Sequence, residues 1–308
     1  LLLSSFTKMK PIELAPNLSL SPIVHGHWRL SDWNLNTQEI ITLTEQSIEL
    51  GITTFDHADI YGNYSCETLF GNALASQKSL RDKIQIVTKC GIKLLSGKFP
   101  ERSTKYYDYS YEYIVSSVNQ SLASLQTDCI DVLLLHRPSP FFNPEEVAKA
   151  FFDLQQSGKV FHFGVSNFSA SQFDMLNSFV DRPLVTNQIE ISPYCLDAFK
   201  DGTLDHLQQH KIKPMAWSPL AGGRLFSPSD ERGNRLLECI STIAQEIGED
   251  NLDKVIYKWL LMHPAGILPI VGTGKIERLK NAADACDLEL SLEQWFRIYI
   301  ASEGKEMA

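Results

Sequence analysis

The chain has 308 residues, of which 44% are hydrophobic and 21% charged, an ordinary globular composition that argues against a disordered, collagen-like or repeat-array protein. Its net charge of −9 and isoelectric point near 5.4 argue against nucleic-acid or membrane binding, because both need a clustered basic face. The length suits an α/β barrel used as one domain, so we expect a single domain over residues 1–308.

The chain opens with eight residues before Met9, which is a plausible coding start, so we expect residues 1–8 to be an upstream extension outside the fold. The run Leu1–Leu3 is too short for the apolar core of a signal peptide. No window approaches the roughly 20 apolar residues of a membrane-spanning helix. The six cysteines show no metal-ligand spacing, so we expect reduced thiols, a cytoplasmic protein and no metal.

Short apolar runs rich in β-branched residues alternate with stretches of helical spacing, such as Ile114–Leu125 and Leu236–Ile247. We interpret eight runs as strands: Pro22–Val24, Ile52–Phe55, Ile84–Val87, Ile130–Leu135, Val160–Val165, Leu184–Gln188, Pro214–Trp217 and Ile267–Val271. This alternation predicts an α/β fold, an eight-stranded parallel (β/α) TIM barrel. An open doubly wound sheet is the alternative, but the first strand is not followed by the glycine-rich G-x-G-x-x-G motif.

Two segments do not fit a minimal barrel, and we expect both to be long loops at its C-terminal face. They are Gly91–Tyr111, which is polar and tyrosine-rich, and Gly222–Gly233, which holds glycine, proline and charged residues. Loops on that face of a barrel usually carry the functional residues.

Polar residues follow three successive predicted strands: Asp56 the second, Lys89 the third and His136 the fourth, with Tyr61 five residues after Asp56. In a barrel these side chains converge. A phenol titrates near about 10, so Tyr61 needs a nearby cation to share its proton at neutral pH, and Lys89 can supply it. Asp56 would hold Lys89 charged, and His136 could bond a carbonyl oxygen. Each residue alone is more often structural, but together they predict a carbonyl-reducing site.

The segment Gly51–Gly62 (GITTFDHADIYG) resembles the signature of the aldo-keto reductase family. Thr88-Lys89, Asp131–Pro138 and Gly158–Asn167 resemble further motifs of that family, in order along the chain. Gly26–Arg29 and Pro269–Lys275 are similar to a small bacterial branch. The resemblance implies an NADPH-dependent reductase of aldehydes or ketones, commonly monomeric, in which Tyr61 is the general acid and Asp56, Lys89 and His136 assist it.

The same resemblance implies a site for NADPH or NADP. Ser166, Asn167 and Gln188 match residues that bond the nicotinamide amide, and Trp217 matches the aromatic residue that stacks on its ring. Other positions implied in cofactor binding are Gly26, Ser218, Leu220, Gly222 and Arg224. Without the family context, turn and core roles are the ordinary interpretation of these residues.

The segment Gly272–Arg278 precedes an expected helix, so its backbone N–H groups can receive a phosphate while Lys275 and Arg278 add positive charge. This suggests the 2′-phosphate of NADPH, and an ordinary solvated helix start is the alternative. The spacing is two residues longer than in aldose-reductase-like members of the family. The candidates for phosphate contact are Thr273, Gly274, Lys275, Arg278 and Asn281.

An aromatic substrate mouth is also expected, suited to an apolar or aromatic carbonyl compound. Its candidate residues are Trp28, His57, Tyr106, Tyr107 and Tyr109.

Three other functions stay open. A metal-dependent hydrolase could use His25 and His27, although further ligands are missing. A Schiff-base aldolase could use a neutral Lys89, although Asp56 should keep that lysine charged. A cofactor-sensing regulatory subunit, which some family relatives form beside ion channels, would keep the same fold and bind a partner protein.

Overall fold

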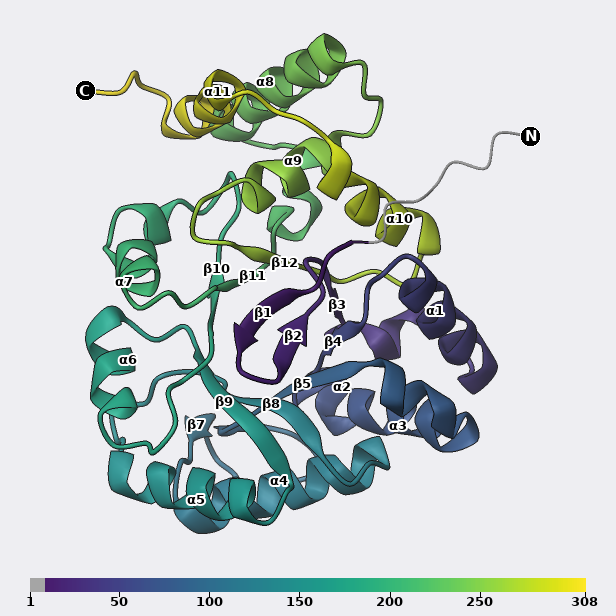
Figure 1. Cartoon of the computed structure of the whole chain (residues 1–308), viewed down its shortest axis with the longest axis vertical. Helices are drawn as coiled ribbons and strands as arrows, with labels where there is room; N and C mark the ends of the chain where they lie inside the picture. Colours follow the sequence, from purple (N-terminus) through teal and green to yellow (C-terminus); the bar gives the residue numbers. More distant parts are fainter. Residues whose placement is uncertain (1–8) are drawn as a thin grey trace.

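The computed structural model describes residues 9–308, and the predicted extension 1–8 lies outside the described residues. Eight parallel strands form a closed barrel in the order β10-β11-β12-β3-β4-β5-β8-β9 (Figure 1). The strands are β3 (Val24–Gly26), β4 (Thr54–Asp56), β5 (Gln85–Cys90), β8 (Ile130–Leu135), β9 (Val160–Ser166), β10 (Asn187–Glu190), β11 (Met215–Trp217) and β12 (Leu268–Val271). The predicted barrel is therefore confirmed, and the open-sheet alternative is excluded.

Helices surround the barrel (Figure 1). They are α1 (Thr37–Glu49), α2 (Tyr61–Tyr64), α3 (Cys66–Ser76), α4 (Tyr111–Leu125), α5 (Pro144–Gln156), α6 (Ala170–Asn177), α7 (Thr203–Gln209), α8 (Glu231–Ile247), α9 (Leu252–Leu261), α10 (Ile276–Asp284) and α11 (Leu292–Glu303). Of these helices, α8 and α11 form an outer pair beyond α9 (Figure 1). Local signals fix several starts: Asn36, Ser169 and Ser291 each form a capping box with the residue three positions on.

An antiparallel hairpin, which the sequence analysis missed, precedes the barrel. It consists of β1 (Ile12–Ala15) and β2 (Leu18–Leu20), and it lies across the barrel opening in Figure 1. Leu18 and Leu20 join the apolar cluster of the barrel interior, which includes Val132 and Met215. Because the hairpin leads directly into β3, it lies at the amino-terminal ends of the strands and leaves the opposite end of the barrel free for a site.

The predicted loop Gly91–Tyr111 contains a second small antiparallel pair, β6 (Ile92–Lys93) with β7 (Tyr106–Tyr107). Lys93 Nζ lies 2.6 Å from Asp108 Oδ2, and Arg102 donates to the Tyr64 hydroxyl at 3.0 Å, so this loop is held against the turn that follows Tyr61. The predicted loop Gly222–Gly233 is shorter than expected. A 3-10 turn spans Ala221–Phe226, and α8 begins at Glu231, where Asp230 caps it.

None of the helices in residues 9–308 is long and apolar enough to cross a membrane. All six cysteines carry free thiols.

Candidate active site

Four polar side chains meet at the carboxyl ends of three adjacent strands. Asp56 ends β4, Lys89 lies near the end of β5, and His136 directly follows β8. Tyr61 begins the short α2, five residues beyond Asp56. The barrel order β4-β5-β8 makes these strand ends neighbours, so the convergence follows from the topology.

The Lys89 ammonium group is the centre of this cluster. Its Nζ lies 2.9 and 2.8 Å from the two carboxylate oxygens of Asp56, 2.8 Å from the backbone carbonyl oxygen of His57 and 2.9 Å from the Tyr61 hydroxyl oxygen. An ammonium group has three N–H bonds, so these acceptors use all of its donors. The Tyr61 oxygen therefore accepts a hydrogen bond, and the phenol proton remains free to be donated elsewhere.

The surroundings determine the charge of each group. Lys89 is only 1% exposed, and although burial lowers its pKa, the contacts with Asp56 and Tyr61 raise that pKa above the ordinary value. Burial raises the pKa of the Tyr61 phenol, while Lys89 acts in the opposite direction. At neutral pH the cluster thus holds a protonated amine beside a protonated phenol. A charged Lys89 does not suit a Schiff-base nucleophile, which must be neutral.

The backbone around Tyr61 turns sharply. Gly62, Asn63 and Tyr64 all have positive φ angles, of 59°, 52° and 66°. A Cβ atom on Gly62 would come within 2.6 Å of Cys66 Sγ and 2.7 Å of Ser31 Oγ, so there is no room for a side chain at this position, and the positive φ adds strain to any other residue. Tyr61 directly precedes this turn, and its hydroxyl oxygen lies 2.9 Å from Lys89 Nζ.

The His136 ring lies beside the Tyr61 ring, with centroids 5.8 Å apart in an edge-to-face arrangement. Burial, followed by the positive charge of Lys89, lowers the pKa of His136 well below its ordinary value. The ring is therefore neutral and carries one N–H donor. Its buried Nδ1 atom has no hydrogen-bond partner within the described chain.

The residues predicted to bind nicotinamide form one connected group at the ends of β9 and β11 and on the neighbouring strand β10. Ser166 donates to the backbone oxygen of Gln188, and Asn167 Nδ2 donates to Ser166 Oγ at 2.9 Å. The Trp217 indole N–H donates to Asn167 Oδ1 at 2.9 Å. Gln188 Nε2 donates to Asp56 Oδ1 at 2.8 Å, so the group is linked to the Lys89 cluster.

The predicted phosphate segment lies between β12 and α10. Lys275 is the N-cap of α10, and no side chain caps that helix start. Lys275 and Arg278 are exposed, and the first turn also holds the exposed Glu277. Thr273 is buried, and its hydroxyl accepts from the Lys275 backbone N–H. Gly274 packs closely on the Trp33 side chain.

Asn281, the remaining phosphate candidate, lies further along α10. Its amide donates to the Asp253 carboxylate at 3.2 and 3.3 Å. Its donors are thus engaged with an anion of the protein itself.

The other predicted cofactor positions lie on two sides of this region. Gly26 ends β3 opposite Asp56, with Gly272 nearby. Positive φ angles occur at Ser218 (50°) and Gly222 (67°) in the turn after β11, and Leu220 lies between them, partly packed on the core.

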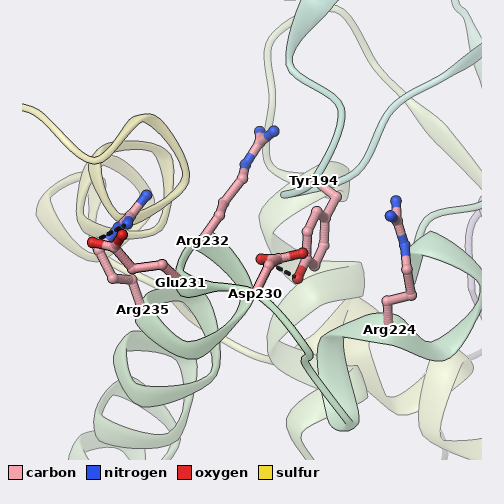
Figure 2. Close-up of a pocket in the computed structure, with 6 residues that line it drawn as sticks. All are labelled: Tyr194, Arg224, Asp230, Glu231, Arg232 and Arg235. Atoms are coloured by element: carbon pink, nitrogen blue, oxygen red, sulfur yellow. Dashed lines mark hydrogen bonds and ion pairs between the residues drawn. The ribbon is translucent and has the colours of Figure 1, made fainter.

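Arg224, at the end of that turn, points into a separate surface hollow of about 520 Å³. Figure 2 shows this hollow, lined by Tyr194, Arg224, Asp230, Glu231, Arg232 and Arg235. Arg224 and Arg232 flank the Tyr194 ring, and none of the four clustered residues lines the hollow. The structure therefore does not bring Arg224 together with the Lys89 cluster.

Two predictions for the substrate mouth are wrong. The His57 side chain is completely buried, lies 3.1 Å from His27 Nδ1 and packs against Phe70. Tyr109 is also buried, and its hydroxyl donates to the backbone oxygen of Arg137. Trp28, Tyr106 and Tyr107 keep exposed surface, and Trp28 is 58% exposed with Arg29 over its ring.

The histidines of the metal-hydrolase hypothesis are enclosed by the fold. His25 Nε2 is 2.8 Å from the backbone oxygen of Thr273, and His27 Nδ1 contacts His57. Burial lowers the pKa of His25 to about 4. Burial also lowers the pKa of His27, so His25 and His27 form a neutral, packed cluster.

Sequence reasoning missed two features of the site. One is the His57 backbone carbonyl that accepts from Lys89, for which no side-chain pattern gives a signal. The other is a buried carboxyl pair behind the cluster: Asp59 bonds Ser117, and Glu67 bonds Thr88. Burial raises the pKa of Asp59 to about 8 and that of Glu67 to about 7. Their signal in the sequence is weak: Asp59 lies three residues after Asp56, and Glu67 lies in the first turn of α3.

Comparison with known proteins places these observations in a family. The model of the aldo/keto reductase family matches residues 22–303. The chain is 50% identical to the uncharacterized oxidoreductase YcsN of Bacillus subtilis, over 97% of this chain and 100% of the relative. It is 42% identical to a 6-dehydroglucose reductase of Agrobacterium fabrum, over 97% and 100%. A crystal structure of the thermostable aldo-keto reductase Tm1743 has the same fold, with a TM-score of 0.80 at 24% identity, over 95% and 100%.

Proposed function

The chain belongs to the aldo/keto reductase family and is an oxidoreductase, and on that premise we propose that it reduces an aldehyde or ketone with NADPH, using Tyr61 as the proton donor. The observation that carries the proposal is the hydrogen-bonding of Lys89. Its three N–H bonds are directed at Asp56, the His57 carbonyl and the Tyr61 oxygen. This leaves the phenol proton as the mobile proton of the cluster.

Tyr61 would give its proton to the oxygen of the carbonyl substrate. The negative charge that develops on the Tyr61 oxygen is then stabilised by the Lys89 cation at 2.9 Å, inside a region of low exposure where such stabilisation is strong. Asp56 keeps Lys89 charged and fixed, and Gln188 in turn fixes Asp56 at 2.8 Å. Each residue thus holds the next in the orientation that proton transfer needs.

His136 would position the carbonyl group. The neutral ring lies next to Tyr61, and a donor there can bond the same carbonyl oxygen that Tyr61 protonates. A protonated His136 would repel Lys89, so the lowered pKa of the imidazole favours this role.

The residues at the strand ends fit a nicotinamide cofactor. Asn167, Ser166 and Trp217 offer an amide, a hydroxyl and an aromatic face next to the Lys89 cluster. The uncapped start of α10, with Lys275 and Arg278, fits a phosphate group. When bound, NADPH supplies the hydride for the carbonyl carbon, and the protein residues supply the proton.

The aromatic mouth led us to expect an apolar or aromatic carbonyl substrate, but we propose a small polar aldehyde or ketone in its place. The reason is the Agrobacterium relative, whose name gives 6-dehydroglucose as its substrate, and sugar aldehydes are therefore the first class to test.

The test is loss of NADPH absorbance with purified protein and a panel of sugar aldehydes, aromatic aldehydes, aliphatic aldehydes and ketones. We expect turnover with at least one class, and much weaker turnover with NADH. Equal use of NADH would contradict the cofactor assignment. Tight NADPH binding without turnover on any compound would favour the cofactor-sensing function instead.

A further inference from the structure

A group of three potential metal ligands lies on the outside of the barrel, on the neighbouring helices α6 and α7. Asp174 belongs to α6, His206 belongs to α7, and His210 is the C-cap of α7. His206 Nε2 is 2.7 Å and His210 Nε2 is 3.6 Å from the same atom, Asp174 Oδ1. The ligand atoms of the three residues all lie within 4.8 Å of one another.

The fold holds the two imidazoles in place without help from an ion. The His210 backbone N–H donates to the His206 carbonyl at 3.1 Å, so the two residues are one helical turn apart on one face. The His206 side chain is only 10% exposed and packs edge-to-face on the buried Phe173 of α6, with centroids 5.4 Å apart. The His206 and His210 rings are themselves 4.7 Å apart.

We propose that Asp174, His206 and His210 form a binding site for a divalent transition metal of the zinc type. Two histidines four residues apart on one helix face form a recurrent metal-binding arrangement, and imidazole nitrogen with carboxylate oxygen is a donor set that Zn²⁺ accepts. Metal–ligand bonds of about 2.0–2.2 Å in a tetrahedron place ligand atoms roughly 3.3–3.6 Å apart. The two distances to Asp174 Oδ1, 2.7 and 3.6 Å, are near that separation, and all the ligand atoms lie within 4.8 Å of one another, so side-chain rotations alone can bring the three ligands to one ion.

The ion would link α6 to α7. Asp174 is half exposed and His210 is 39% exposed, so solvent water can complete the coordination at the fourth position. An ion that binds the folded chain at these three residues stabilises it by mass action, because the unfolded chain does not hold them together. In the metal-free protein, the Asp174–His206 hydrogen bond serves as the tie between the helices.

The test is titration of EDTA-treated full-length protein with ZnCl₂ by isothermal titration calorimetry, paired with thermal melts with and without Zn²⁺. His210→Ala is the main variant, because it removes one ligand and leaves the Asp174–His206 bond intact. Asp174→Asn is the second, since an amide retains the size of the carboxyl group. His162→Ala is the control, since His162 lies on β9 and outside the cluster.

We expect the wild type and His162→Ala to bind one Zn²⁺ per chain and to melt at a higher temperature with Zn²⁺. His210→Ala and Asp174→Asn should each bind at least about tenfold more weakly, because loss of a ligand costs no less than loss of a residue that supports one. If both variants bind Zn²⁺ with the affinity of the wild type, the ion binds elsewhere, for example at the cysteine thiols, and the proposal is overturned. Absence of stoichiometric binding by the wild type would also overturn it. Reductase activity plays no part in these readouts, so their outcome is independent of the proposed function.

Discussion

Replacement of Lys89 by methionine should expose how strongly the buried cluster depends on charge. Methionine keeps an unbranched apolar chain but removes all three N–H donors. Asp56 would then keep the Gln188 amide at 2.8 Å as its hydrogen-bond donor, and its negative charge would remain buried without a cation. Breaking a buried pair in this way costs about 3–5 kcal/mol. At about 1.4 kcal/mol per factor of ten, the ratio of folded to unfolded protein should fall roughly 10²–10⁴-fold.

The assay is equilibrium urea unfolding of the wild type, Lys89→Met, Asp56→Asn and the double variant. The double variant should recover part of the loss, because it leaves no unpaired charge, so the coupling energy between the two substitutions should exceed about 1 kcal/mol. Lys280→Met is the matched control. Lys280 Nζ lies 3.0 Å from Asp284 Oδ2, nearly the same distance, but the Lys280 side chain is 51% exposed and that of Asp284 28% exposed, so this pair should contribute about 0–1 kcal/mol. If Lys89→Met costs no more than Lys280→Met, the buried ion pair does not have the energetic role described here.

Three further results are expected. Gly62→Ala should destabilise the fold by about 1–3 kcal/mol and lower turnover, because a side chain at φ 59° is strained and meets Cys66 and Ser31. Urea unfolding curves equal to those of the wild type would refute this. Lys275→Ala combined with Arg278→Ala should raise the KM for NADPH at least about tenfold while the KM for NADH changes little, and equal effects on both cofactors would argue against a 2′-phosphate contact. Burial raises the pKa of Asp59 to about 8, so the unfolded chain loses this proton at lower pH than the folded chain. The free energy of unfolding should therefore fall as the pH rises from about 4 to about 8. Asp59→Asn should reduce this loss, measured as the difference in urea midpoint between about pH 5 and about pH 8.

The eight barrel strands could be predicted because each is an apolar run between turn residues, and each overlaps a strand of the structure. The two small hairpins could not be predicted from the sequence. Strands β6 and β7 have two residues each, too few for any alternation of polar and apolar side chains to be visible. Hairpin β1–β2 lies before the repeating units begin, and the alternation in Ile12–Leu14 and Leu18–Leu20 is shorter than the roughly four residues that a strand signal needs.

At the site, the convergence of Asp56, Lys89 and His136 could be predicted because residues at the ends of parallel strands must share one edge of the barrel. The burial of the His57 side chain could not be predicted. Its backbone N–H still bonds the Val87 carbonyl at 2.7 Å, so the strand geometry continues through this residue and directs its side chain to the face opposite Asp56, against Phe70. Sequence position alone makes His57 look like another strand-end residue.

The central claim is that Tyr61 donates the proton, and the most direct test compares Tyr61→Phe with the wild type and with Tyr299→Phe, which removes a phenol from the outer helix α11. Single-turnover reduction of the best carbonyl substrate is measured beside NADPH binding. We predict a rate about 10²–10⁴-fold lower for Tyr61→Phe, with NADPH affinity preserved, and wild-type values for Tyr299→Phe. Undiminished reduction by Tyr61→Phe would contradict the account.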